Sequence, residues 1–194
     1  MPLTYAKCKN ANWPPGKKRI RLDDRLERDR GAGAALITFT DAPMRAATVL
    51  DGDANTLYSL TIAYAFTDST QNMNKEANQG GPFGDSRERW IRNDPSLHTD
   101  CIRAALRIES YGAYAKNNSD IYALLRRQYR PVEMLKFPED AHPLSRSSGR
   151  MISLQVNVDW YRFWLKGECR QVPSCRERRP TACRTSTGGG CRWP

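Results

Sequence analysis

Residues 131–142 read PVEMLKFPEDAH, an apolar run between two prolines that is followed by a polar loop. The run at 132–137 predicts a β-strand, because alternating apolar residues bounded by proline are typical of strands. Directly before it, residues 120–128 predict a helix: Asp120 is an N-cap type of residue, and Ile121, Leu124 and Leu125 follow at helical spacing. Pro131 ends this helix.

Expected strands and helices also alternate through the rest of the chain. Strands are expected at 45–50 and 104–108, and residues 56–66 fit either a helix or a buried strand. Residues 71–87 predict a loop, and a short helix is expected at 86–92. The last expected helix covers 151–165, with one apolar stripe of Met151, Leu154, Val158, Tyr161 and Leu165. Strands that alternate with helices predict an α/β domain with a mostly parallel sheet and flanking helices.

Charge divides the 194 residues into three segments. Residues 1–30 hold nine basic and four acidic side chains, and residues 169–194 hold six basic side chains and one acidic side chain. Residues 31–168 have a net charge of zero. Both basic flanks are expected to be disordered or foreign to the domain, because they have too few apolar residues to offset the entropy of ordering. A nucleic-acid binder with basic tails is one alternative function, but no recognition motif accompanies the charge, so no specific nucleic-acid partner is expected.

Cysteine placement follows the same division. Only Cys101 lies in the neutral segment, which is therefore not expected to depend on disulfides, and a reducing, cytoplasmic location is expected. The tail cysteines at 169, 175, 183 and 191 lack the close pairs of a structural zinc site, so neither a metal nor another cofactor is expected. No apolar run of 18 residues predicts a membrane span, and no membrane partner is expected.

Three stretches resemble a known family: residues 131–142, Pro143 to Arg146, and residues 157–165, which read NVDWYRFWL. Together they resemble the end of the catalytic domain of prolyl oligopeptidase-family serine peptidases, and residues 35–48 resemble the segment just after that family's nucleophile elbow. The resemblance covers residues 31–168. It implies a partial α/β-hydrolase fold, peptide substrates in intact relatives, and His142 as the catalytic histidine, last in the chain order Ser, acid, His.

The acid of the triad has two candidates, Glu109 and Asp120, since no Asp occupies the family's usual position. Glu109, at the expected end of a strand, either orients His142 or is solvated. Asp120 has a competing role as a helix N-cap. The other histidine, His98, lies in an expected polar loop and is predicted to be a surface residue.

The nucleophile is missing from this chain. No G-x-S-x-G motif is present, and residues 1–33 contain no serine at all. We therefore expect a truncated relative with little or no turnover. A half sheet would expose an edge, so self-association through that edge is expected, and a non-catalytic interaction domain is the remaining alternative.

Overall fold

The computed structural model describes residues 38, 44–51, 56–66, 73, 76–77, 80–112, 116, 118–141 and 143–168. The two basic flanks and His142 lie outside these residues. The chain forms two compact units, divided between Ser145 and Arg146.

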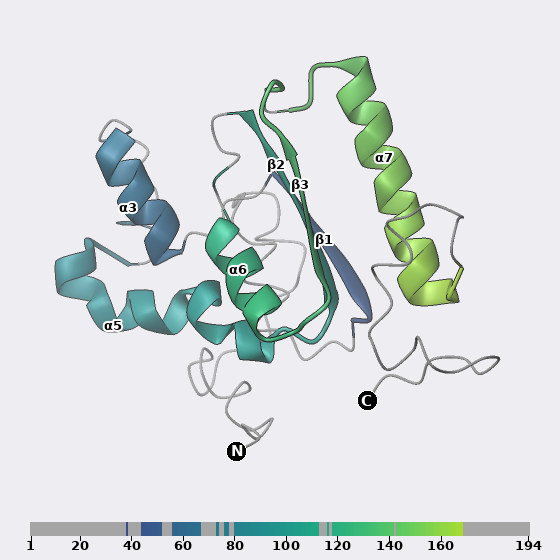
Figure 1. Cartoon of the computed structure of the whole chain (residues 1–194). Coiled ribbons are helices and arrows are strands. Elements are labelled where there is room, and N and C mark those ends of the chain that lie inside the picture. The colour runs from purple at the N-terminus through teal and green to yellow at the C-terminus, as the bar shows by residue number, and fades with distance from the viewer. Residues whose placement is uncertain are drawn as a thin grey trace. The chain divides into compact units, whose positions relative to one another are not determined.

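The first unit contains a parallel sheet of three strands (Figure 1). The strands are β1 (Ala46–Leu50), β2 (Ala105–Tyr111) and β3 (Val132–Phe137), in the order β1-β2-β3. Both pairings are parallel, with Ala46 opposite Ala105 and Leu106 opposite Val132. The predicted α/β class, with a small parallel sheet and flanking helices, is confirmed, and β2 continues three residues beyond its predicted end.

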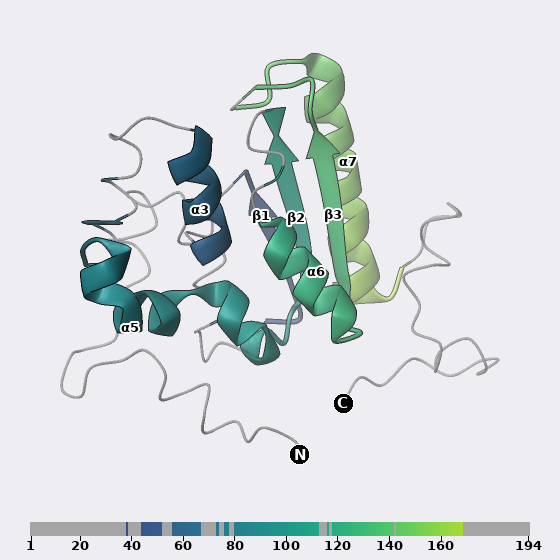
Figure 2. The same cartoon turned by 60° about the vertical axis from the view of Figure 1, so that its left-hand side comes forward.

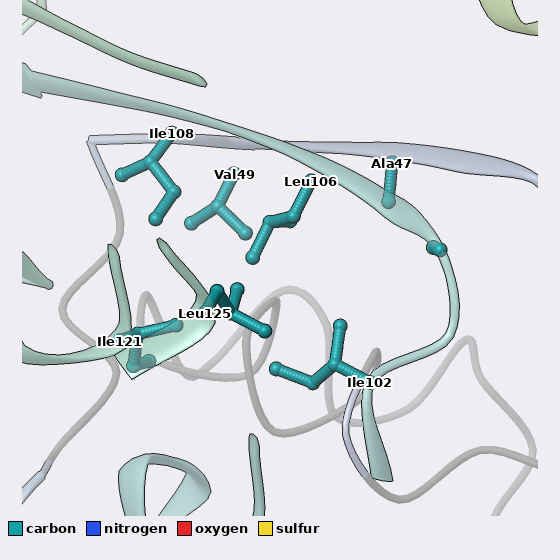
Figure 3. Close-up of a cluster of buried hydrophobic side chains, with 8 residues drawn as sticks. Ala47, Val49, Ile102, Leu106, Ile108, Ile121 and Leu125 are labelled. Carbon is teal, nitrogen blue, oxygen red and sulfur yellow. The ribbon is translucent and has the colours of Figure 1, made fainter. Parts of the chain in front are cut away.

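One face of the sheet packs against α6 (Ser119–Arg127), which connects β2 to β3 and lies across the sheet (Figure 2). Leu106 and Ile108 project from β2 toward Ile121 and Leu125 of α6, and Val49 of β1 joins them (Figure 3). This cluster of apolar side chains is buried, and its burial is the main force that holds the helix on the sheet.

The described residues before β2 include α3 (Leu57–Phe66), α5 (Phe83–Asn93) and the 3-10 helix η1 (Pro95–Cys101). The predicted loop at 71–87 is wrong at Met73, Glu76 and Ala77, which are helical, and again from Phe83, where α5 begins. Trp90 explains the difference: its ring is buried, and its indole Nε1–H donates to the Gly81 carbonyl at 3.0 Å. This contact fixes the chain at Gly81, directly before the N-cap of α5.

The second unit contains α7 (Ser147–Tyr161), which ends in a π-helical turn at Arg162–Lys166. The predicted helix is present, but its buried face is not the predicted apolar stripe. Gly149, Ser153, Trp160 and Trp164 are buried, whereas Met151, Leu154 and Val158 are exposed. The two tryptophan rings lie 5.5 Å apart, and their size makes them the packing residues of this helix.

Cys101 corrects a further expectation. It is disulfide-bonded, and the other five cysteines all lie outside the described residues. The neutral segment is therefore cross-linked, contrary to the expectation that it does not depend on disulfides. Within the described ranges, no helix has the length and apolar character needed to cross a membrane.

Candidate functional site

The three strands end at the same edge of the sheet because they are parallel, and loops at this edge form the ligand crevice in open α/β sheets. Asp51 follows β1 directly. Its backbone N–H donates to the Glu109 carbonyl at 2.8 Å, and its Oδ1 accepts from the Tyr111 N–H at 3.2 Å. The end of β1 is thereby fixed to the end of β2.

The loop after β3 is organised around the buried carboxylate of Asp140. Its Oδ1 accepts from the Ser145 N–H at 2.8 Å, from the Ser145 hydroxyl at 2.9 Å and from the Ala141 N–H at 3.3 Å. These bonds join the two ends of a short segment, residues 140–145. His142 belongs to this segment by sequence but lies outside the described residues.

The loops after β2 and β3 touch each other. Gly112, with φ of +51°, lies so close to Asp140 that a β-carbon at this position would come within 2.5 Å of the Asp140 carbonyl oxygen. Only glycine fits there, because both the backbone conformation and the available space exclude a side chain. Asp140 is therefore in contact with the residue that directly follows the central strand.

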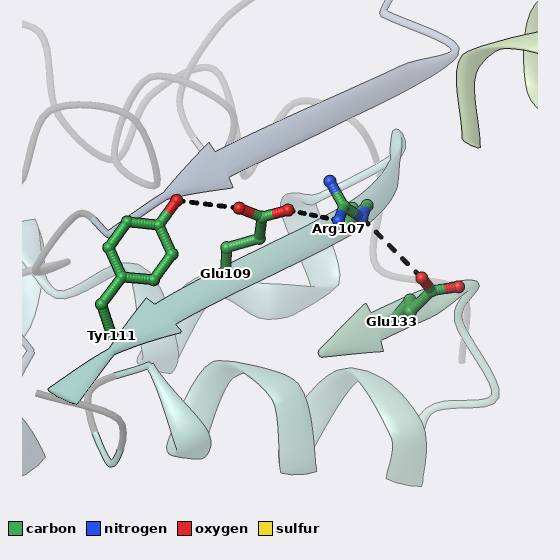
Figure 4. Close-up of polar contacts among 4 residues, drawn as sticks. All are labelled: Arg107, Glu109, Tyr111 and Glu133. Atoms are coloured by element: carbon green, nitrogen blue, oxygen red, sulfur yellow. Dashed lines mark hydrogen bonds and ion pairs between the residues drawn. The ribbon is translucent and has the colours of Figure 1, made fainter. Parts of the chain in front are cut away.

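Glu109 lies inside β2 and faces away from α6, since side chains alternate along a strand and Ile108 belongs to the core cluster. Its side chain is 0% exposed, so the prediction that it could be solvated is wrong. The Arg107 guanidinium donates to Oε1, and the Tyr111 hydroxyl donates to Oε2 at 2.8 Å (Figure 4). Arg107 also lies 3.7 Å from a Glu133 carboxylate oxygen on β3. We call these four residues the β2 polar cluster.

Asp120 is not the N-cap of α6. The helix begins one residue earlier, after Asn118, and Asp120 lies in its first turn, with Oδ1 accepting from the Ile121 N–H at 2.9 Å. Burial raises the pKa of the Asp120 carboxyl, and the Asp94 carboxylate adds to this effect, while hydrogen bonds from Thr56 and Ile121 partly offset it. Asp120 therefore belongs to a carboxylate environment on the α6 side of the sheet.

The two predicted acids consequently lie on opposite faces of the sheet. Glu109 points away from α6, whereas Asp120 is part of α6 itself. The structure does not bring them together, so at most one of them can contact a given histidine ring.

Sequence reasoning missed two buried carboxylates, Asp94 and Asp140. Asp94 is 0% exposed and accepts from the Leu57 N–H at 2.8 Å, the Ser96 N–H at 2.8 Å and the Ser96 hydroxyl at 2.7 Å. The Asp-Pro-Ser sequence at 94–96 was an available signal, because Asp before proline favours a turn and caps a following helix. For Asp140 no local signal exists, since its partner Ser145 is separated from it by a loop.

No group of three or more His, Cys, Asp or Glu side chains among the described residues is placed to hold a metal ion. No family model matches this chain, and no curated protein matches it.

Proposed function

We propose that residues 31–168 are the C-terminal part of a serine-peptidase catalytic domain of the prolyl oligopeptidase type, with His142 as its general base. In such a site the imidazole takes the proton of a serine hydroxyl and later returns it to the leaving amine. The parallel strand order and the helix between β2 and β3 support this assignment.

The observation on which the proposal depends is the tied loop after the last strand. A general base must be held in one orientation relative to its nucleophile, and small displacements cost large factors in rate. Asp140 and Ser145 close the segment on both sides of position 142, and Gly112 fixes that segment to the end of β2. This construction suits a loop that positions one side chain.

The chain supplies no nucleophile of the expected type. Its one Gly-x-Ser sequence, at 84–86, continues with Arg87 and Glu88 instead of glycine, and Ser86 lies within α5 rather than on a turn after a strand. We therefore expect no peptide hydrolysis by this chain alone, because a base without its nucleophile leaves little rate enhancement.

The proposal can be tested by NMR on protein with isotope-labelled histidine. The chain has only two histidines, and the His98→Gln variant assigns the signals. We expect the His142 ring to titrate in the ordinary range, about pH 6 to 7. A ring that stays neutral across this range and shows contacts only to apolar side chains would refute the role as a general base.

The same signal identifies the acid. We compare Asp120→Asn and Glu109→Gln with the control Glu139→Gln, which removes an exposed charge from the His142 loop itself. One of the first two variants should lower the pKa of His142 by more than the control does, since a contacting carboxylate favours the charged imidazolium. If neither variant differs from the control, both acid assignments are wrong.

Labelling with a fluorophosphonate probe tests the expected inactivity. No covalent adduct should form on the wild-type chain. An adduct that disappears in a His142→Ala variant would show that another serine acts as the nucleophile.

A further inference from the structure

The edge of the sheet at which the three strands begin is strongly basic. Because the strands are parallel, their amino ends lie together: the Ala105 N–H donates to the Arg45 carbonyl at 3.0 Å, and the Leu106 N–H donates to the Pro131 carbonyl at 3.0 Å. The helix α6 ends at the same edge, since only residues 128–131 separate it from β3 (Figure 2). Segments that are far apart in the sequence therefore meet here.

Five arginines lie at this edge. The segments that form it, 44–46, 100–105 and 126–132, contain these arginines and a single acid, Asp100. All five arginines are exposed, and we call them the arginine edge: Arg45, Arg103, Arg126, Arg127 and Arg130. Soluble surfaces ordinarily intersperse both signs of charge, whereas a concentration of one sign attracts ligands of the opposite sign. The arginine edge therefore favours a polyanion.

One aromatic side chain is displayed among these arginines. Tyr129 is 89% exposed and has φ of +57°, in the left-handed region that favours glycine. Its backbone is fixed, because the Tyr129 N–H donates to the Arg126 carbonyl at 3.0 Å and the Arg130 N–H donates to the Leu125 carbonyl at 2.9 Å. These bonds form a Schellman motif, in which glycine is the usual residue at the position of Tyr129. Packing does not explain this strained tyrosine, and strained residues are typical of functional sites.

We propose that the arginine edge binds single-stranded nucleic acid, with arginines contacting the phosphates and the Tyr129 ring stacking on a base. Sites that bind single strands without sequence preference combine these two features, a positive surface and exposed aromatic rings, and they need no recognition motif. A membrane site would need several apolar side chains beside the ring, but the two neighbours of Tyr129, Gln128 and Arg130, are polar and exposed. The proposal is independent of the proposed hydrolase function, whose loop after β3 lies at the opposite edge of the sheet.

Fluorescence anisotropy of the full chain with labelled oligo(dT) of about 12 nucleotides measures this binding. The double variant Arg127→Gln/Arg130→Gln removes two charges from the arginine edge. The slope of log Kd against log salt concentration should fall by about 1.4, because each phosphate contact to a single strand contributes about 0.7. The matched control Lys116→Gln/Lys136→Gln removes two exposed charges that follow or end β2 and β3 at the other edge, and it should leave the slope unchanged. Both variants keep the basic flanks, so a difference between them comes from the arginine edge.

The Tyr129→Ala variant tests the stacking. It should weaken oligo(dT) binding by at least about fivefold, the lower end of what one base–aromatic contact contributes. Tyr129→Phe should retain the affinity of wild type, because the ring stacks without its hydroxyl. Inorganic polyphosphate carries the charges but no bases, so Tyr129→Ala should leave its affinity unchanged. Circular dichroism confirms that each variant is folded.

Three results would overturn the proposal. The first is an equal loss of oligo(dT) affinity in Arg127→Gln/Arg130→Gln and in the lysine control, because the charge of the whole chain would then account for binding. The second is a Tyr129→Ala variant that binds oligo(dT) like wild type or that loses polyphosphate affinity to the same extent. The third is a chain that does not bind oligo(dT) but binds vesicles containing phosphatidylserine through the same arginines, which would assign the edge to a membrane surface.

Discussion

Replacing Arg107 with methionine should be among the most destabilising single changes in this chain. The guanidinium is the one cation of the β2 polar cluster, which also contains the carboxylates of Glu109 and Glu133. The Arg107→Met variant keeps a side chain of similar length but leaves Glu109, which is 0% exposed, without its counter-charge.

The expected magnitude follows from what each carboxylate retains. Glu109 keeps the hydrogen bond from the Tyr111 hydroxyl, at 2.8 Å, while Glu133 is 26% exposed and keeps contact with water. Removing one partner of a buried ion pair costs about 3 to 5 kcal/mol, and the remaining Tyr111 bond places the cost near 3 kcal/mol. Glu109→Gln should cost only about 1 kcal/mol, because the amide oxygen still accepts and Arg107 keeps Glu133.

Urea unfolding followed by circular dichroism at 222 nm measures these differences. The double variant Arg107→Met/Glu109→Leu should recover most of the loss, since an apolar pair of similar size replaces the buried charges. The reasoning is refuted if Arg107→Met unfolds within about 1 kcal/mol of wild type, or if Glu109→Gln costs as much as Arg107→Met.

Four further predictions concern other parts of the molecule. Tyr129 has φ of +57° at the end of α6 and is 89% exposed, so Tyr129→Gly should stabilise the chain by about 0.5 to 1 kcal/mol in urea unfolding, whereas Tyr129→Ala should give no gain. Asp94→Ala should cost about 2 to 3 kcal/mol in the same assay, because it removes the acceptor at the starts of both α3 and η1; a cost below about 0.5 kcal/mol would contradict the observed bonds. The pKa of Asp120 is raised above its ordinary 3.8, so the stability that its protonated form contributes is fully present at low pH and is lost as the pH rises through the folded-state pKa. Asp120→Asn should therefore be more stable than wild type at neutral pH, and this advantage should vanish below about pH 4. An equal difference in stability at all pH values would be inconsistent with the raised pKa. Peptide mapping without reductant should recover Cys101 linked to another cysteine-containing peptide, and recovery of the free thiol would disprove the disulfide.

Local patterns predicted the elements of this fold well. The strand at 132–137 was predicted with its observed bounds, because two prolines limit it and its apolar content is dense. The helix before it was predicted to within one residue at each end, since its apolar spacing and its charged C-terminal turn are strong signals. The 3-10 helix η1 was missed, because short helices of polar residues depend on caps such as Asp94.

The candidate site was predicted less well. Glu109 and Asp120 were selected by their positions in the sequence, but the alternation along β2 and the position of α6 separate them onto opposite faces of the sheet. Asp140 and Gly112 were not selected at all, because their contact joins two loops that are far apart in the chain.

The sequence by itself determined the period of the segments at 120–128, 132–137 and 151–165, and therefore that the first and last become helix and the middle one becomes strand. Only the tertiary structure decided which face of each element is buried: Glu109 lies inside an ion-pair cluster, and the apolar stripe of α7 remains exposed while its tryptophans pack. The physical reason is that periodicity arises from neighbours a few residues away, whereas burial depends on side chains that come from distant parts of the chain.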